Sequence, residues 1–289
     1  MSLTDVCRCY SKTFRLSSGR QAMKVSKPMF KLACIAAWFC VAAGAAHAAD
    51  LLDTVKRAGV LKIAMEGTYP PFDSRDASGN LVGFDVDVAK AVAARLGVKP
   101  EFIATEWSGI LAGLQAGKYD VIVNEVTITP PRKQALDFSQ PYVYSAAQLI
   151  QRANDDRRFG SLAEFKGDKK LGVTLGTNYD AMARAVPGIN AQTYPGAPEK
   201  LSDLVSGRID ATLDDRLMIP YLLKTTQLPL RAGAVVPGGG QEMGIPFRKG
   251  NPKFAKALDD AIGAMKQDGT LRKISVQWFG VDTSVPAAN

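Results

Sequence analysis

The stretch "LAGLQAGKYD" at 111–120 has a close counterpart in "LSDLVSGRID" at 201–210. Both follow the pattern Leu-x-x-Leu-x-small-Gly-basic-x-Asp. Leucines three residues apart mark one face of a helix, and the glycine suits the left-handed position that ends it. Each copy leads into an apolar segment with strand character, "VIVNE" at 121–125 and "ATLDD" at 211–215. The repeat therefore predicts two copies of a helix–strand unit.

A second pair of related segments lies upstream of these copies. "LKIAMEGTYP" at 61–70 and "KLGVTLGTNY" at 170–179 each read as a strand followed by Gly-Thr and a nearby tyrosine. Between the strands of the first half, "FDVDVAKAVAARLG" at 84–97 has valines and a leucine on one helical face. Alternating strands and helices predict an α/β protein with mostly parallel sheets covered by helices.

The duplicated plan predicts two lobes. We expect the first lobe to contain residues 49–144 and 241–289, and the second to contain residues 145–240. Two crossover strands, near 144–150 and 236–245, would join them. The helical runs at the end of the chain would then return to the first lobe.

The N-terminal region has the pattern of an export signal. An unbroken apolar run occupies residues 32–46, three lysines precede it, and Ala46-His47-Ala48 follow it. A positive region, a short apolar region and a small-x-small site are typical of a secretory signal peptide. We expect residues 23–48 to form it, with cleavage after Ala48 and a periplasmic product. An uncleaved anchor is less favoured because the run is shorter than a membrane span of about 20 residues.

Residues 1–22 show no core pattern and are expected to be an extension. Met1, Met23 and Met29 all remain possible translation starts.

Removing residues 1–48 changes the composition of the chain. This segment holds seven of the 36 basic and one of the 28 acidic residues, so residues 49–289 carry 29 and 27, a net charge of +2. The overall charge of +8 is therefore no evidence for nucleic-acid binding. All four cysteines and the single histidine also lie in the segment. Their loss excludes a Cys nucleophile, a Ser–His pair, a disulfide framework and the usual zinc sites.

The glycine-containing segments do not match known nucleotide-binding motifs. "GLQAGKY" at 113–119 lacks the spacing and the Ser or Thr of a phosphate loop. "GGGQEMG" at 238–244 does not fit the dinucleotide fingerprint. We therefore expect no cofactor, no metal ion and no catalytic residue of these classes.

Polar side chains gather where the predicted strands end. Ligands of open parallel sheets bind beyond the carboxyl ends of the strands. Two lobes would place four such ends around one cleft. The candidates at these ends are Glu66, Tyr69, Asn124, Glu125, Thr127, Thr177, Asn178, Asp214 and Asp215.

Arg132 has an unusual place in "VIVNEVTITPPR" at 121–132. Thr129 suits a helix N-cap and Pro130 the first helical position, which puts Arg132 in the first turn. A cation there opposes the helix dipole. Either the side chain is simply solvated, or it shares an anion with the free N–H groups of the turn. A guanidinium pairs well with a carboxylate, which favours the second interpretation.

Six segments together resemble one protein family. They are "EGTYPPF", "LVGFDVDVAKAVAARLG", "VTITPPRKQALDFSQPY", "LGTNYD", "SGRIDATLDDR" and "MKQDGTLRKISVQWFG", in this order between residues 50 and 280. They are similar to the periplasmic amino-acid-binding proteins of ABC importers, the bacterial extracellular solute-binding proteins of family 3. "NEVTIT", "GTNY" and "DATLDDRL" look most like the cystine-binding branch. The resemblance implies a type II periplasmic-binding-protein fold.

The resemblance also implies roles for individual residues. Arg132 would pair with the α-carboxylate of the ligand, assisted by Thr127 and by the turn at Thr177. Asp214 would bind the α-ammonium group. These opposite charges on the two lobes would let a zwitterion favour the closed form, because only that form satisfies both contacts.

Other positions would shape the pocket. Tyr69 and Trp107 would line it, and Glu66 would reach a distal group of the ligand. Asn178 departs from the Ser or Thr common in the family, which leaves its contact open. How Asn124 and Glu125 are used also remains open.

These features predict a binding protein that is not an enzyme. Its expected ligand is a free amino acid, with cystine first and cysteine, glutamine or a similar polar amino acid as alternatives. Its expected partners are the transmembrane subunits of an ABC permease, with no nucleic acid, and the protein is expected to be a monomer. An exported lyase similar to cyclohexadienyl dehydratase, with Glu66 or Glu125 as the acid, is the alternative from another class. A receptor that reports the ligand to a sensor is a third possibility.

Overall fold

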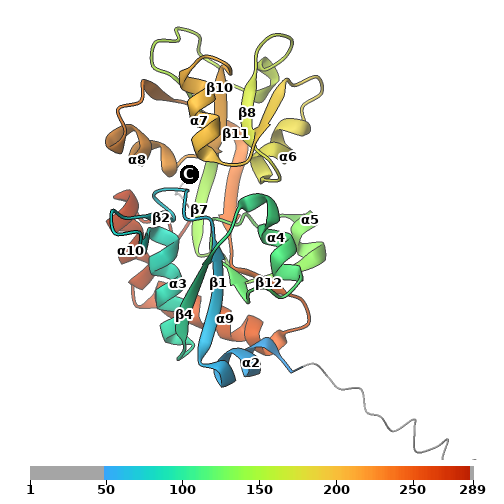
Figure 1. The fold of residues 1–289 in the computed structure, drawn as a ribbon, viewed down its shortest axis with the longest axis vertical. Helices are drawn as coiled ribbons and strands as arrows, with labels where there is room; N and C mark the ends of the chain where they lie inside the picture. Colours follow the sequence, from blue (N-terminus) through green and yellow to red (C-terminus); the bar gives the residue numbers. More distant parts are fainter. Residues whose placement is uncertain (1–48, 287–289) are drawn as a thin grey trace, which may run out of the picture. The chain divides into compact units, whose positions relative to one another are not determined.

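Two five-stranded sheets organise the part of the chain that the computed structural model describes, residues 49–286 (Figure 1). The strand order is β4-β1-β5-β12-β6 in the first sheet and β11-β7-β10-β8-β9 in the second. Each sheet has parallel pairs and flanking helices, so the predicted two-lobed α/β fold is confirmed. The predicted signal peptide at 23–48, its cleavage after Ala48 and the extension at 1–22 lie outside the described residues.

The strands are short, apart from two. The first sheet contains β1 (Val60–Met65), β4 (Lys99–Ala104), β5 (Val121–Ile122), β6 (Leu136–Phe138) and β12 (Pro246–Arg248). The second contains β7 (Val143–Arg152), β8 (Leu171–Thr174), β9 (Ala191–Tyr194), β10 (Ala211–Asp215) and β11 (Leu230–Met243). A separate ribbon is formed by β2 (Ser74–Arg75) and β3 (Leu81–Val82).

Helices pack on both sheets. Those of the first lobe are α2 (Leu51–Ala58), α3 (Phe84–Arg95), α4 (Trp107–Gln115), α5 (Pro130–Ala135), α9 (Pro252–Gln267) and α10 (Thr270–Phe279). Those of the second are η2 (Leu162–Glu164), α6 (Asn178–Arg184), α7 (Ala197–Val205) and α8 (Met218–Thr225). Helices α9 and α10 pack on α3 of the first lobe. In residues 49–286, no helix combines the length and apolar character that a membrane span requires.

The sequence repeat corresponds to equivalent structure in the two lobes. Its two copies form the ends of α4 and α7, and both glycines after these helices have positive φ, 74° and 78°. The aspartate at the end of each copy accepts the same kind of hydrogen bond. Asp120 accepts a hydrogen bond from the backbone N–H of Lys62 (2.9 Å), and Asp210 accepts one from that of Lys170 (2.7 Å). Each aspartate thus fixes the helix–strand turn to the neighbouring strand.

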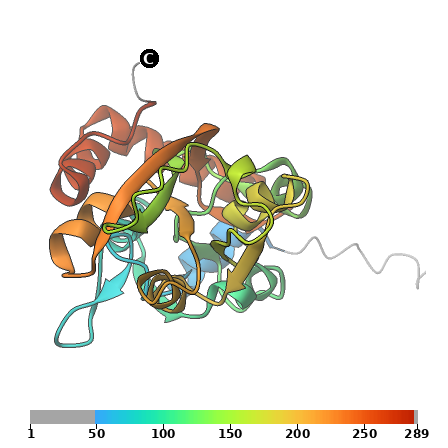
Figure 2. The same cartoon turned by 90° about the horizontal axis from the view of Figure 1, so that it is seen from above.

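Strands β7 and β11 connect the two lobes. They pair antiparallel, from Val143 opposite Met243 to Arg152 opposite Leu230, with two register shifts in β11. The two strands lie side by side in both views (Figures 1 and 2). They correspond to the crossover strands expected from the sequence. The division of the chain at 144/145 and 240/241 remains a prediction.

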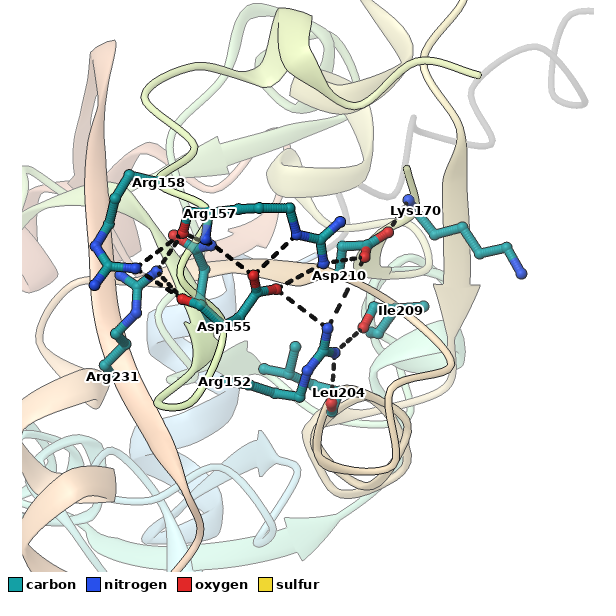
Figure 3. Close-up of polar contacts among 10 residues, drawn as sticks. Arg152, Asp155, Arg157, Arg158, Lys170, Leu204, Ile209, Asp210 and Arg231 are labelled. Atoms are coloured by element: carbon teal, nitrogen blue, oxygen red, sulfur yellow. Dashed lines mark hydrogen bonds and ion pairs between the residues drawn. The ribbon is translucent and has the colours of Figure 1, made fainter. Parts of the chain in front are cut away.

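A network of charged groups holds the far end of the second lobe together (Figure 3). Arg152, at the end of β7, donates to the carbonyl oxygens of Leu204 in α7 and of Ile209 in the α7–β10 connection (3.0 and 2.5 Å). It also pairs with Asp155 (3.2 Å), while Arg157 bridges Asp155 and Asp210 (2.6 Å each). The network fixes α7 and β10, which carry side chains of the candidate site.

Candidate functional site

One cavity brings together strand ends from both lobes. It is lined by Glu66, Tyr69, Trp107, Asn124, Glu125, Thr174, Thr177, Asn178, Tyr179, Ala197 and Asp214. Eight of the sequence-predicted site residues are in this set, whereas Thr127, Arg132 and Asp215 are not. Sequence reasoning missed Thr174, Tyr179 and Ala197. Thr174 and Tyr179 flank "LGTN" at 175–178, so closer attention to that turn would have found them.

Asn124 joins the ends of two neighbouring strands. Its Oδ1 accepts a hydrogen bond from the backbone N–H of Glu66 (2.6 Å), and its Nδ2 donates to Glu66 Oε2 (3.0 Å). This pair of contacts fixes the Glu66 side chain after β1. Burial raises the pKa of Glu66 to about 7, and the nearby charge of Asp214 adds to the effect. Glu66 can therefore change its protonation state near neutral pH.

Asp214 is held from both lobes. Its Oδ1 accepts a hydrogen bond from the hydroxyl of Tyr69 in the first lobe (2.6 Å). Its Oδ2 pairs with Lys200 Nζ in α7 (2.6 Å), which also donates to Thr174 Oγ1 (3.1 Å). Both charged side chains are buried, with exposed fractions of 1% and 2%. The sequence around Lys200, "PEKLSDL", has the pattern of an ordinary amphipathic helix and gives no sign of this role.

The turn before α6 presents two of the predicted residues. Thr177 is the N-cap, where its Oγ1 accepts from the backbone N–H of Asp180 (3.2 Å) and donates to the carbonyl oxygen of Thr174 (2.7 Å). Asn178 follows as the first residue of the helix, and its side-chain Nδ2 is buried without a hydrogen-bond partner in residues 49–286. A donor of this kind facing a cavity is available to a ligand.

Arg132 lies beside the cavity wall. The prediction that Thr129 caps α5 is confirmed, since its Oγ1 accepts from the backbone N–H of Arg132 (3.4 Å). Arg132 Nη1 donates to the carbonyl oxygen of Thr127 (2.9 Å), and the guanidinium lies over the Trp107 ring, 5.4 Å from its centroid. Burial lowers the pKa of Arg132 to about 10, so the side chain is still cationic at neutral pH. No ion pair in the described part of the chain involves Arg132.

Thr127 lies against a connecting strand. Its hydroxyl donates to Gln241 Oε1 in β11 (3.3 Å), and its backbone pairs with Met243. It therefore contacts the connecting strand rather than the cavity, although Arg132 binds its carbonyl oxygen.

Glu125 ends the first-lobe strand in an unusual way. The sequence predicted a strand over 121–125, but β5 ends at Ile122. Glu125 has φ of +50°, a left-handed conformation that a non-glycine residue rarely adopts and that cannot continue a strand. Its side chain lines the cavity and is 7% exposed.

The chemistry of the cavity suits binding of a positively charged group. Carboxylates are prominent in its lining, and residues 49–289 contain no cysteine or histidine. In residues 49–286, no cluster of three or more potential ligand side chains is placed to hold a metal ion. Backbone and side-chain donors at the α6 turn and the nearby Arg132 could accept an anionic group of the same ligand.

Comparisons with known proteins identify relatives of this chain. The family model of bacterial extracellular solute-binding proteins, family 3, matches residues 61–281. The L-cystine-binding protein TcyJ of Escherichia coli (strain K12) is 42% identical over 235 residues, which cover 81% of this chain and 88% of that protein. The L-cystine-binding protein TcyA of Bacillus subtilis (strain 168) is 36% identical over 236 residues, 81% of this chain and 87% of that protein.

Solved structures are similar over the same region. The ancestral amino acid-binding protein AncCDT-1, a precursor of cyclohexadienyl dehydratase, matches with a TM-score of 0.73 at 33% identity, covering 80% of this chain and all of that one (100%). An ancestral arginine-binding protein bound to arginine has a TM-score of 0.72 at 36% identity, covering 77% and 99%. On these grounds, and as its sequence motifs indicated, the chain belongs to the bacterial extracellular solute-binding proteins, family 3.

Proposed function

We propose that this chain is an exported, periplasmic protein that captures an amino acid, with cystine as the first candidate, and delivers it to an ABC permease. The observation that carries the proposal is the cavity whose lining comes from the strand ends of both lobes. A ligand there contacts both lobes only when they are closed, so binding favours closure. The 42% identity to a protein named for L-cystine supports the choice of ligand.

Arg132 is our proposed partner of the ligand α-carboxylate. The guanidinium is adjacent to Trp107 of the cavity wall and has no ion pair within residues 49–286. It reaches the ligand by turning away from the carbonyl oxygen of Thr127, and the turn at Thr177 contributes further donors. A half-buried cation without a counterion has lost part of its hydration, and a ligand carboxylate supplies a counterion.

The remaining proposed roles follow the cavity lining. Asp214 binds the ligand ammonium group in this proposal, and its carboxylate then lies between that group and Lys200. Tyr69 and Trp107 form walls, and Glu66, fixed by Asn124, faces a distal polar group of the ligand. We further propose that the protein works as a monomer without nucleic acid and catalyses no reaction.

A panel of amino acids, including cystine, cysteine, glutamine and arginine, tests the proposal by thermal shift and calorimetry. A ligand at a hundredfold excess over Kd stabilises the folded protein by about 2.7 kcal/mol. We expect cystine to do so, and Asp137→Asn in the first lobe, outside the cavity lining, serves as the control variant. If no amino acid binds, the proposed function is wrong.

A lyase is the second candidate, because one observation favours it. The pKa of Glu66 is raised to about 7, as a general acid requires, and AncCDT-1 is described as a precursor of a dehydratase. Incubation with prephenate or arogenate separates the two functions. We expect no product, whereas product formation that is lost in Glu66→Gln would establish the lyase.

A further inference from the structure

Two arginines at the far end of the second lobe bind the same pair of backbone carbonyl oxygens (Figure 3). Arg158, in the segment after β7, donates from Nη1 to the carbonyl oxygens of Asp155 (2.7 Å) and Arg157 (3.1 Å). Arg231, near the start of β11, donates from Nη2 to the same two oxygens (3.2 and 2.7 Å). The two guanidinium groups therefore lie next to each other, although they come from distant parts of the chain.

This arrangement supplies more donors than the two carbonyl oxygens need. A backbone carbonyl oxygen has two lone pairs. The carbonyl oxygen of Arg157 accepts from both arginines and also from Gln151 Nε2 (3.2 Å). The carbonyl oxygen of Asp155 accepts from both arginines. Either arginine alone would leave both oxygens hydrogen-bonded, so the backbone contacts do not explain the second positive charge.

The carboxylates that are paired in this region are paired with other arginines. The Asp155 side chain is 8% exposed and binds Arg152 (3.2 Å) and Arg157 (2.6 Å). The Asp210 carboxylate also binds Arg157 (2.6 Å). Within residues 49–286, no ion pair involves either of the two arginines at the shared carbonyl oxygens. These two arginines are therefore a surplus of positive charge in the network.

The surplus charge is partly withdrawn from water. Arg231 is half-buried, and Arg158 is exposed. Burial lowers the pKa of Arg231, and the positive charge of Arg158 lowers it further, while the charges of Asp155 and Asp156 oppose this only in part. An anion between the two guanidinium groups would be attracted by both of them and would offset their mutual repulsion. The pair is therefore suited to an anion from outside the chain.

The unused donors favour a tetrahedral oxyanion. Nε and Nη2 of Arg158 and Nη1 of Arg231 have no hydrogen-bond partner in the described part of the chain. Two neighbouring guanidinium groups can bind several oxygens of one phosphate group, whereas a carboxylate occupies a single guanidinium. A phosphate monoester carries a charge of about −1.5 to −2 at pH 7, which matches two arginines.

We propose that Arg158 and Arg231 together form a binding site for a phosphate group, outside the amino-acid cavity. The phosphate group bridges the two guanidinium groups, and the shared carbonyl oxygens hold these groups in place. Free phosphate and the headgroups of anionic phospholipids both carry this chemistry. The inference does not depend on the ligand of the cavity, so the amino-acid titrations neither support nor overturn it.

Titration of the whole, isotope-labelled protein with sodium phosphate tests this. Sodium chloride keeps the ionic strength constant, so that general screening does not change. We expect saturable shifts of the backbone amide signals of residues 153–158 and 230–232. The Kd should be on the order of 1 mM, as a few charge-assisted hydrogen bonds at a partly exposed site imply. Shifts confined to the cavity near Arg132 would overturn the proposal.

Two variants and a matched control assign the site. Arg158→Gln and Arg231→Gln should each weaken phosphate binding at least about tenfold, because each removes one of the two bridged cations. Both variants should fold, since each carbonyl oxygen keeps another donor. Arg184→Gln removes the same charge from an exposed arginine of the second lobe that is paired with Asp180 (2.7 Å), and it should leave phosphate binding unchanged.

The control separates a site from an effect of net charge. Equal weakening in Arg184→Gln, or unchanged binding in Arg158→Gln or Arg231→Gln, would overturn the proposal.

Sedimentation with phosphatidylcholine vesicles, with and without phosphatidylglycerol, distinguishes the two sources. Saturable binding of inorganic phosphate that needs both arginines supports a free phosphate. Binding only to the vesicles with phosphatidylglycerol, lost in both variants, supports a lipid headgroup. If neither inorganic phosphate nor these vesicles bind, the proposal is wrong.

Discussion

Replacing Lys200 with methionine tests whether the buried charge of Asp214 is matched within the folded protein. The ion pair has a separation of 2.6 Å, and its side chains are 1% and 2% exposed. Methionine keeps most of the length of the lysine stem and removes the charge. The carboxylate then keeps the hydroxyl of Tyr69 but loses its cation.

The expected loss of stability depends on whether the Asp214 carboxylate stays ionised after Lys200 is removed. Removing one partner of a buried ion pair costs about 3–5 kcal/mol. The carboxyl group can avoid part of this cost by binding a proton. Protonating an ordinary aspartic acid at pH 7 costs about 4 kcal/mol, which sets the upper limit, and at pH 5 it costs about 1.5 kcal/mol. Lys200→Met should therefore destabilise the protein by about 3–4 kcal/mol at pH 7 and by about half of that or less at pH 5.

Urea unfolding of the ligand-free protein at both pH values measures this loss. The double variant Lys200→Met/Asp214→Asn removes both charges and should recover most of the stability. Lys256→Met, on the exposed surface of α9, should change it by less than about 0.5 kcal/mol. A loss below about 1 kcal/mol for Lys200→Met at pH 7 would refute the reasoning. Such a result would mean that Lys200 contributes little to stabilising the Asp214 carboxylate, which could then bind a ligand cation without losing this partner.

Three further predictions concern other charged groups. Arg132→Ala should weaken amino-acid binding by about 2–5 kcal/mol in calorimetry, because the ligand carboxylate loses its cation; unchanged affinity would exclude the proposed role. The pKa of Glu66 is raised to about 7, so between about pH 4.5 and about pH 7 the folded protein keeps a proton on Glu66 that the unfolded chain has lost. The free energy of unfolding therefore falls as the pH rises through this range. In Glu66→Gln, the decrease in the free energy of unfolding over this pH range should be smaller by about 2–3 kcal/mol. Unfolding experiments across the range measure it, and the same pH dependence in the variant and the unaltered protein would contradict the prediction. Arg152→Ala should destabilise the protein by about 1.5–3 kcal/mol, because two carbonyl oxygens and Asp155 lose their hydrogen-bond donor. Chemical unfolding measures this loss of stability. A loss under about 0.5 kcal/mol would show that the network contributes little.

The sequence was sufficient for the architecture because the architecture is encoded locally. The two copies of the repeat at 111–120 and 201–210 carry their helix-ending glycines and strand-fixing aspartates within ten residues. The cap of α5 and the glycine between α9 and α10 are likewise short-range signals. Such features can be read without knowing what packs against them.

The details of the site could not be read in this way, because they depend on contacts between distant parts of the chain. Lys200 meets Asp214 only because α7 packs on β10. The acids around Glu125 are Asp73, Asp85 and Asp215, which come from three separate parts of the chain, and no spacing in the sequence predicts that they meet. The sequence could place Thr127 at a strand end, but not against Gln241 of β11.

The place of β12 in the first sheet has a consequence for the order of assembly. This strand lies between β5 and β6, although more than a hundred residues separate it from either neighbour in the chain. All strands of the second sheet precede it, from Val143 to Met243. During synthesis, which starts at the N-terminus, the chain can thus complete its second sheet while the first sheet still lacks an inner strand. The lobe that begins first is the last to be finished, and β5 and β6 keep unpaired edges until residue 248 arrives.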